Sequence, residues 1–114
     1  MNDYSDDAME STAQRLRALA HANRLRILGW LSDPEAHFPP QVDGDLVKDG
    51  VCVGFITEKI KLKQPTVTNH MKVLQDAGLV ESKKIKNWVF YKLREDQIAH
   101  ILSATAEVTR TASE

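Results

Sequence analysis

The fold of this chain is decided by the stretch of residues 63–81, which reads KQPTVTNHMKVLQDAGLVE. Val67, Met71 and Leu74 stand at i, i+4 and i+7, the spacing of one face of an α-helix. The pattern predicts a helix over Gln64–Asp76 whose apolar face packs inward. The opposite side of this helix is polar and is therefore available to a partner.

The outward face of this predicted helix carries side chains that form hydrogen bonds. They are Gln64, Thr66, Thr68, Asn69, His70 and Lys72. Hydroxyls, amides and imidazoles can donate to and accept from base edges in the major groove of DNA. Helices that read bases place their N-terminal turns against them, which puts the first four of these residues foremost. A solvated helix face would have the same composition, so the interpretation depends on the neighbouring elements.

The elements on both sides of this helix predict a winged helix-turn-helix. A short helix is expected near Gly54–Lys61, and the tight turn Leu62-Lys63 joins it to the next helix. Residues 79–85 and 88–93 have the composition of strands. Lys86-Asn87 lies between them as a hairpin turn, in which Asn tolerates a positive φ.

The first part of the chain is predicted to be helical after an acidic start. Leu16, Leu19 and Ala20 form an apolar stripe in a helix that is expected to begin at Ser11. Residues 1–10 are acidic and are expected to be flexible.

The remaining elements complete one domain. A second helix follows with Asn23 as its N-cap, and a last helix begins at Asp96. Residues 33–50, the acidic segment, hold five acids, three prolines and two glycines and read as a long loop. The predicted fold class is mainly α with a small β-hairpin, in the order α-α-loop-α-α-β-β-α. It forms a single domain over residues 11–114.

The charge of the chain is unevenly distributed. The 114 residues carry a formal net charge of −1, with 15 basic and 16 acidic side chains. Residues 59–92 hold eight lysines and two acids, or +6, which leaves seven basic and fourteen acidic residues, or −7, elsewhere. This asymmetry indicates one segment made for a polyanion within an acidic body.

The predicted hairpin carries both lysines and aromatic residues. Lys83, Lys84 and Lys86 lie at or beside its tip, where lysines neutralise phosphates and add affinity without sequence information. The aromatic residues are Trp88, Phe90 and Tyr91. They could stack on single-stranded bases, but cross-strand and core packing is the favoured interpretation.

Composition also limits the class of protein. The single cysteine, Cys52, cannot form an internal disulfide, which fits a reducing compartment. No apolar run approaches the ~18 residues of a membrane span, and the acidic start lacks the apolar region of a secretory signal. A cytoplasmic protein without membrane contact is expected. No catalytic spacing, paired carboxylates or Gly-rich phosphate loop is present, so an enzyme is not expected.

Several segments together resemble the ArsR/SmtB-type bacterial repressors. They are LAHANRLRIL (19–28), KQPTVTNHMKVL (63–74), AGLVE (77–81) and WVFYKL (88–93). The resemblance covers roughly residues 12–104 and implies a homodimer joined through its first and last helices. It also implies a pseudo-palindromic operator in double-stranded DNA and repression relieved by an effector.

The expected dimer interface follows from the same resemblance and from the last helix, whose apolar stripe would otherwise face water. Its predicted residues are Leu16, Leu19, Ile98, Ile101, Leu102 and Thr105. A twofold dimer would present two reading helices about 34 Å apart, one turn of B-DNA.

The chain departs from the family pattern where metal-sensing members bind their ions. Cys52 matches the first ligand of a Cys-x-Cys pair, but the second position is Gly54. On the last helix Asp96 matches a leading acid, but Ile98 occupies the next ligand position. Neither site supplies three or four N or S donors, so no metal and no cofactor is expected. A site that joins Cys52 to a histidine or loop acid stays an alternative, and the effector is undefined.

Two further departures concern the reading helix and the hairpin. Lys63 replaces the Ser that commonly caps the helix, and Lys86 stands where a Gly is common. The acidic segment is a candidate for sensing or for an extra dimer contact, although a tolerated insertion is the simpler explanation. A DNA-binding repressor is the leading hypothesis, and a winged-helix module that docks on an acidic protein surface is the alternative.

Overall fold

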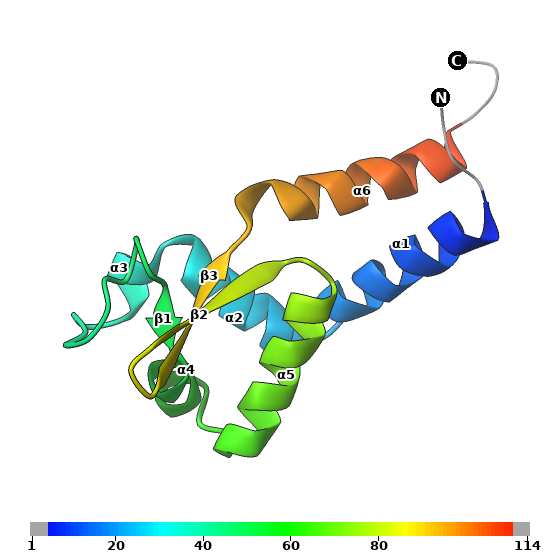
Figure 1. Cartoon of the computed structure of the whole chain (residues 1–114). Coiled ribbons are helices and arrows are strands. Elements are labelled where there is room, and N and C mark those ends of the chain that lie inside the picture. Colours follow the sequence, from blue (N-terminus) through cyan, green and yellow to red (C-terminus); the bar gives the residue numbers. More distant parts are fainter. Residues whose placement is uncertain (1–4, 111–114) are drawn as a thin grey trace.

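The computed structural model describes residues 5–110. Its elements in chain order are α1 (Asp6–Leu19), α2 (Ala22–Ser32), α3 (Pro34–His37), β1 (Val51–Cys52), α4 (Val53–Ile60), α5 (Gln64–Asp76), β2 (Val80–Ile85), β3 (Trp88–Leu93) and α6 (Glu95–Thr109). The chain is elongated, with extents of 54 × 24 × 23 Å, because α1 and α6 run out together from the remaining elements (Figure 1). This is the predicted winged helix-turn-helix.

The core is built around α5. Val67, Met71 and Leu74 are fully buried, as their spacing predicted, and they pack with Ile27 of α2 and Ile56 of α4. Full burial of such a side chain contributes about 1.5–3 kcal/mol to stability. Helix α5 is thus held in place by the hydrophobic core of the domain.

Three antiparallel strands form the sheet, in the order β1-β3-β2. The hairpin β2–β3, here called the wing, pairs Val80 with Leu93 and Ile85 with Trp88. The two-residue strand β1 was not predicted, since it exists only through pairing with β3, where Cys52 lies opposite Phe90. The predicted helix near residue 54 begins directly after it, at Val53.

Two helix starts differ from the prediction. Helix α1 begins at Asp6 rather than Ser11, because the Ser5 hydroxyl accepts a hydrogen bond from the Ala8 N–H and Asp6 favours the positive end of the helix dipole. Helix α2 is capped by His21, whose Nδ1 accepts from the Asn23 N–H, so Asn23 is not the N-cap. Residues 1–4 lie outside the described part of the chain.

The acidic segment is more ordered than a long loop. It contains the short helix α3, and its Phe38 and Leu46 side chains are buried in the core. The amide of Gln41 donates to the carbonyls of Gly44 and Gly50 and its Oε1 accepts from the Cys52 N–H, so one side chain holds the segment against β1.

Close contacts fix the acidic segment on the outer face of the wing. A Cβ added at Gly44 would lie 2.6 Å from Cε1 of Phe90, so only glycine fits between the segment and this ring. Gly50 has φ +106°, and a Cβ added there would lie 2.4 Å from the carbonyl oxygen of Tyr91. The segment is therefore the cover under which Phe90 is buried.

The turn of the wing uses a different residue from the one predicted. Lys86 adopts φ 56°, in the left-handed region, whereas Asn87 does not have a positive φ. The hairpin thus places a lysine where glycine would be the least strained residue.

Among the described residues, no helix is both long enough and apolar enough to cross a membrane.

Candidate nucleic-acid interface

The helix-turn-helix is formed by α4 and α5. Helix α4 ends at Ile60, the following Lys61 takes the left-handed conformation (φ 60°, ψ 41°), and Lys63 is extended before α5 begins. The Lys63 carbonyl accepts from the N–H groups of Thr66 and Val67, while no side chain caps the helix. The replacement of the usual Ser by Lys therefore leaves the start of α5 with a backbone cap only.

The polar face of α5 is largely as predicted. Its exposed side chains are Gln64, Thr66, Thr68, Asn69 and Lys72. Lys72 also forms an ion pair with Asp76, one turn further along the helix, at 3.1 Å. The structure thus brings five of the six predicted reading residues to one exposed surface, and their contact with bases stays a prediction.

The sixth residue, His70, was placed wrongly. Its side chain is only 7% exposed, and its ring centroid lies 4.6 Å from that of His21. Position 70 follows Val67 by three residues and precedes Leu74 by four, so it belongs to the buried stripe of α5. This spacing could have identified His70 as a core residue from the sequence.

His70 belongs to a junction between α1, α2 and α5. Arg24 places Nη1 3.2 Å from Nδ1 of His70 and donates to the carbonyls of Ala18 and Arg17 at the end of α1. Because a guanidinium only donates, the His70 nitrogen accepts and the ring is neutral there. Burial, reinforced by His21 and Arg24, lowers the pKa of His70 below its usual 6.5.

The wing lysines are not equally available. Lys83 contacts Asp49 at 2.6 Å and Lys86 contacts Asp43 at 2.9 Å, both carboxylates belonging to the acidic segment. Lys84 is exposed and has no ion pair with any residue in the range 5–110. From the sequence, Lys83, Lys84 and Lys86 were all expected to be available to phosphate. The only feature of the sequence that pointed to carboxylate partners was the acidity of residues 33–50.

The aromatic residues of the wing divide between core and surface. Phe90 and Tyr91 are 2% and 7% exposed, which confirms the packing interpretation for them. Trp88, at the tip, is half exposed. It lies beside a cavity of about 180 Å³ that Phe55, Phe90 and residues 40–43 also line.

A second surface is formed by α1, α2 and α6. A hollow of about 640 Å³ is lined by Leu16, Leu19, Ala20, Leu25, Leu28, Gly29, Ser32, Leu93, Ile98 and Leu102. Leu25 and Leu102 are each more than half exposed. Four of the six predicted dimer residues thus meet on one apolar surface.

The other two predicted dimer residues are engaged within the chain. Ile101 is 1% exposed and packs in the core, so it cannot form a dimer contact as predicted. The Thr105 hydroxyl donates to the Ile101 carbonyl at 2.8 Å. Ile101 is the buried residue of α6, and Ile98, one turn earlier, is partly buried against the same core.

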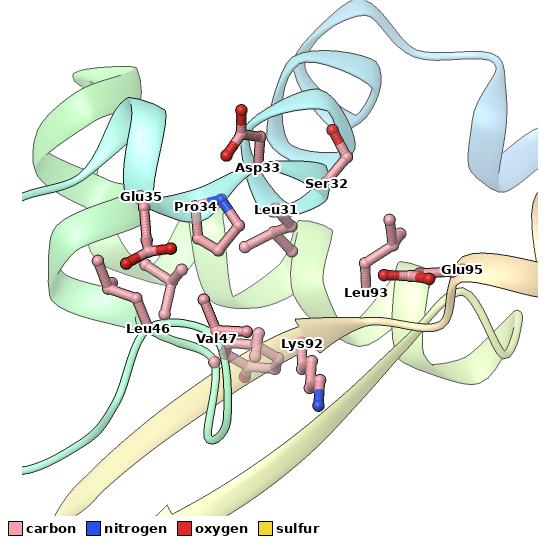
Figure 2. Close-up of a pocket in the computed structure, with 13 residues that line it drawn as sticks. Leu31, Ser32, Asp33, Pro34, Glu35, Leu46, Val47, Lys92, Leu93 and Glu95 are labelled. Atoms are coloured by element: carbon pink, nitrogen blue, oxygen red, sulfur yellow. The ribbon is translucent and has the colours of Figure 1, made fainter.

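A further cavity of about 190 Å³ lies where the end of α2, α3, the acidic segment and the end of β3 meet (Figure 2). Leucines and three carboxylates line it, those of Asp33, Glu35 and Glu95. Cys52 is buried, and no group of three or more His, Cys, Asp or Glu side chains in residues 5–110 is arranged to hold a metal ion.

Comparison with known proteins identifies the family to which the chain belongs. Residues 19–83 match the helix-turn-helix domain model. The chain is 38% identical over 85 residues to the HTH-type transcriptional regulator YbzH of Bacillus subtilis, covering 75% of this chain and 85% of that protein. It is 24% identical over 103 residues to the arsenical resistance operon repressor of the same bacterium, covering 90% and 85%.

Solved structures agree with the fold. The crystal structure of an ArsR-family transcriptional regulator superposes with a TM-score of 0.67 at 20% identity, covering 97% of this chain and 100% of that one. The chain therefore belongs to the ArsR/SmtB-type winged helix-turn-helix family of DNA-binding transcriptional regulators.

Proposed function

We propose that this regulator is a homodimeric repressor that reads a pseudo-palindromic operator with α5 and leaves it when an effector binds. The observation that carries the proposal is the exposed face of α5, with its hydroxyl and amide side chains beside the wing. Repression is supported by the related arsenical resistance operon repressor.

Base reading is assigned to the N-terminal half of α5. Thr66 and Asn69 are exposed one turn apart on the helix, so their side chains project from the same side. An asparagine amide can form two hydrogen bonds to adenine, and a threonine can contact several bases. Since Met71 and Leu74 fix the opposite side of the helix, these groups are presented in a constant orientation.

Dimerisation is assigned to the apolar hollow between α1, α2 and α6. Leu25 and Leu102 expose large apolar side chains there, and a second copy of the chain would remove both from water. A twofold axis at this surface would relate two α5 helices, and a palindromic site requires that both face the same side of the dimer.

DNA binding is tested by selection from a pool of random 25–30 bp duplexes, followed by fluorescence anisotropy on the selected sequence. Enrichment of a palindrome and a steep loss of affinity with salt are expected, because phosphate contacts release counterions. Absence of enrichment together with salt-independent binding would reject the proposal and favour a protein-docking role.

A sharper test separates the roles proposed for α5 (discrimination between sequences) and for the wing (affinity for any duplex). Thr66→Ala and Asn69→Ala should each lose about 1–3 kcal/mol of discrimination between the selected sequence and a random duplex. Lys84→Ala should weaken binding to both duplexes alike and reduce the salt slope by about 0.9 for each protomer.

Gln75→Ala is the matched control, because Gln75 is exposed near the far end of α5 and should leave both affinities unchanged. Equal losses on both duplexes for Thr66→Ala and Asn69→Ala, which is the behaviour expected of Lys84→Ala, would contradict the assignment of reading to α5. In all four variants, unchanged unfolding by urea would show that the fold is intact.

A further inference from the structure

We propose that Asp43 and Asp49 restrain sequence-independent DNA binding by holding Lys86 and Lys83 of the wing in intramolecular ion pairs. A DNA phosphate must therefore compete with these carboxylates for the charge of either lysine. The inference rests on the proposed function, because it assumes that the wing lies against the DNA backbone.

The geometry of the two pairs favours competition with phosphate. The Nζ–carboxylate distances are 2.6 Å for Lys83 with Asp49 and 2.9 Å for Lys86 with Asp43. The lysine side chains are 53% and 73% exposed, whereas the carboxylates are 13% and 26% exposed. Each lysine is thus reachable from solvent, while each carboxylate is set into the acidic segment beneath it.

Asp49 is also held by a hydrogen bond that does not involve Lys83. Asp49 accepts the Asp45 N–H at 2.9 Å, and Asp45 in turn accepts the N–H groups of Val47 and Lys48. The hydrogen bond from Asp45 and the contact with Lys83 lower the pKa of Asp49, so this carboxylate stays charged. An ion pair with a carboxylate that is already fixed costs less side-chain entropy than a pair between two mobile side chains.

The acidic segment itself is anchored on the wing. Gly44 lies against the Phe90 ring, and Gln41 bonds the segment to Gly50 and Cys52. Asp43 stands directly between Val42 and Gly44, so the anchor and the ion pair belong to the same turn. The segment therefore moves with the wing and stays beside its lysines.

The expected consequence follows from counterion release. A lysine that contacts a phosphate contributes about 0.9 to the slope of log K against log salt. A lysine paired with a carboxylate is already neutralised and contributes less. Removal of both carboxylates should therefore steepen the slope by up to about 1.8 for each protomer.

The test compares Asp43→Asn/Asp49→Asn with the parent protein on a fluorescein-labelled 25-bp duplex of random sequence, between 50 and 200 mM salt. The variant should bind more tightly, and its advantage should grow about ten-fold per protomer as salt falls across this range. Asn at position 49 can still accept the Asp45 N–H, so the segment keeps its shape.

A charge-matched control separates the ion pairs from net charge. Asp33→Asn/Glu35→Gln also adds two units of positive charge, but neither acid has an ion pair with a residue in the described range. This control should show a smaller gain. An equal gain in both double variants would overturn the inference, because it would show a general charge effect.

A second variant pair makes the test independent of that control. Lys83→Gln/Lys86→Gln should change affinity for the random duplex little in the parent, where the lysines are paired, and strongly in Asp43→Asn/Asp49→Asn. Equal losses in both backgrounds, or weaker binding after removal of the acids, would reject the inference. A parent that binds no duplex would instead reject the proposed function.

Discussion

The two elements that we propose to contact DNA, α5 and the wing, are held in place differently. Helix α5 is fixed by the buried side chains Val67, Met71 and Leu74, and its exposed face is almost uncharged. The wing carries four lysines, and two of them, Lys83 and Lys86, are paired with carboxylates of the acidic segment. The orientation of the exposed side chains of α5 thus depends on the stability of the core, whereas the charge that the wing presents depends on ion pairs at the surface.

The largest expected effect comes from removing the core support of α5. Leu74→Ala leaves a cavity under a fully buried side chain and should lower the free energy of unfolding by about 2–5 kcal/mol. Urea unfolding followed by circular dichroism measures it. Thr68→Ala, on the exposed side of the same helix, should change stability by no more than about 0.5 kcal/mol. A similar result for both variants would mean that α5 is not held by the core.

An intermediate effect is expected where the acidic segment meets the wing. In Gly44→Ala the new Cβ would lie 2.6 Å from the Phe90 ring, so the segment must move, at a cost of about 1–3 kcal/mol. Gly29→Ala is the control, because nothing lies within 4 Å of its Cβ in the middle of α2. That variant should be more stable than the parent by about 0.5–1 kcal/mol. A stable Gly44→Ala protein would show that the segment is not packed on Phe90.

The smallest predicted effect is a pH dependence of the stability that arises from His70 of α5 and has no counterpart in the wing. The pKa of His70 lies below its usual 6.5, chiefly because burial disfavours the charged ring, with His21 and Arg24 adding repulsion. The unfolded chain therefore binds a proton at a higher pH than the folded one does. Stability from this residue is complete above about pH 6.5 and falls as the pH drops below that value.

His70→Gln should remove part of the stability difference between pH 7.5 and pH 5.5, measured by urea unfolding. The expected change is a fraction of the Leu74→Ala effect. His37→Gln, which replaces an exposed histidine of α3, should keep the pH dependence of the parent. An unchanged pH dependence in His70→Gln would contradict a neutral, buried His70.

Elements with a clear hydrophobic periodicity could be predicted from the local sequence alone. The bounds Gln64–Asp76 of α5 and the three buried residues on its apolar face agree with the spacing in the sequence. His70 was misplaced because hydrogen-bonding chemistry was weighed above helical position, and the spacing alone would have put it in the core. Strand β1 could not be predicted, since two residues have no pattern of their own.

The sequence by itself determined the winged helix-turn-helix, the polar reading face of α5 and the concentration of positive charge around the wing. Each depends on residues close together in the chain, where helical and strand periodicity apply. Only the tertiary structure decided that Asp43 and Asp49 pair with Lys86 and Lys83 and that Gly44 covers Phe90. These contacts join residues more than thirty positions apart, and their distances are set by how the acidic segment packs on the sheet.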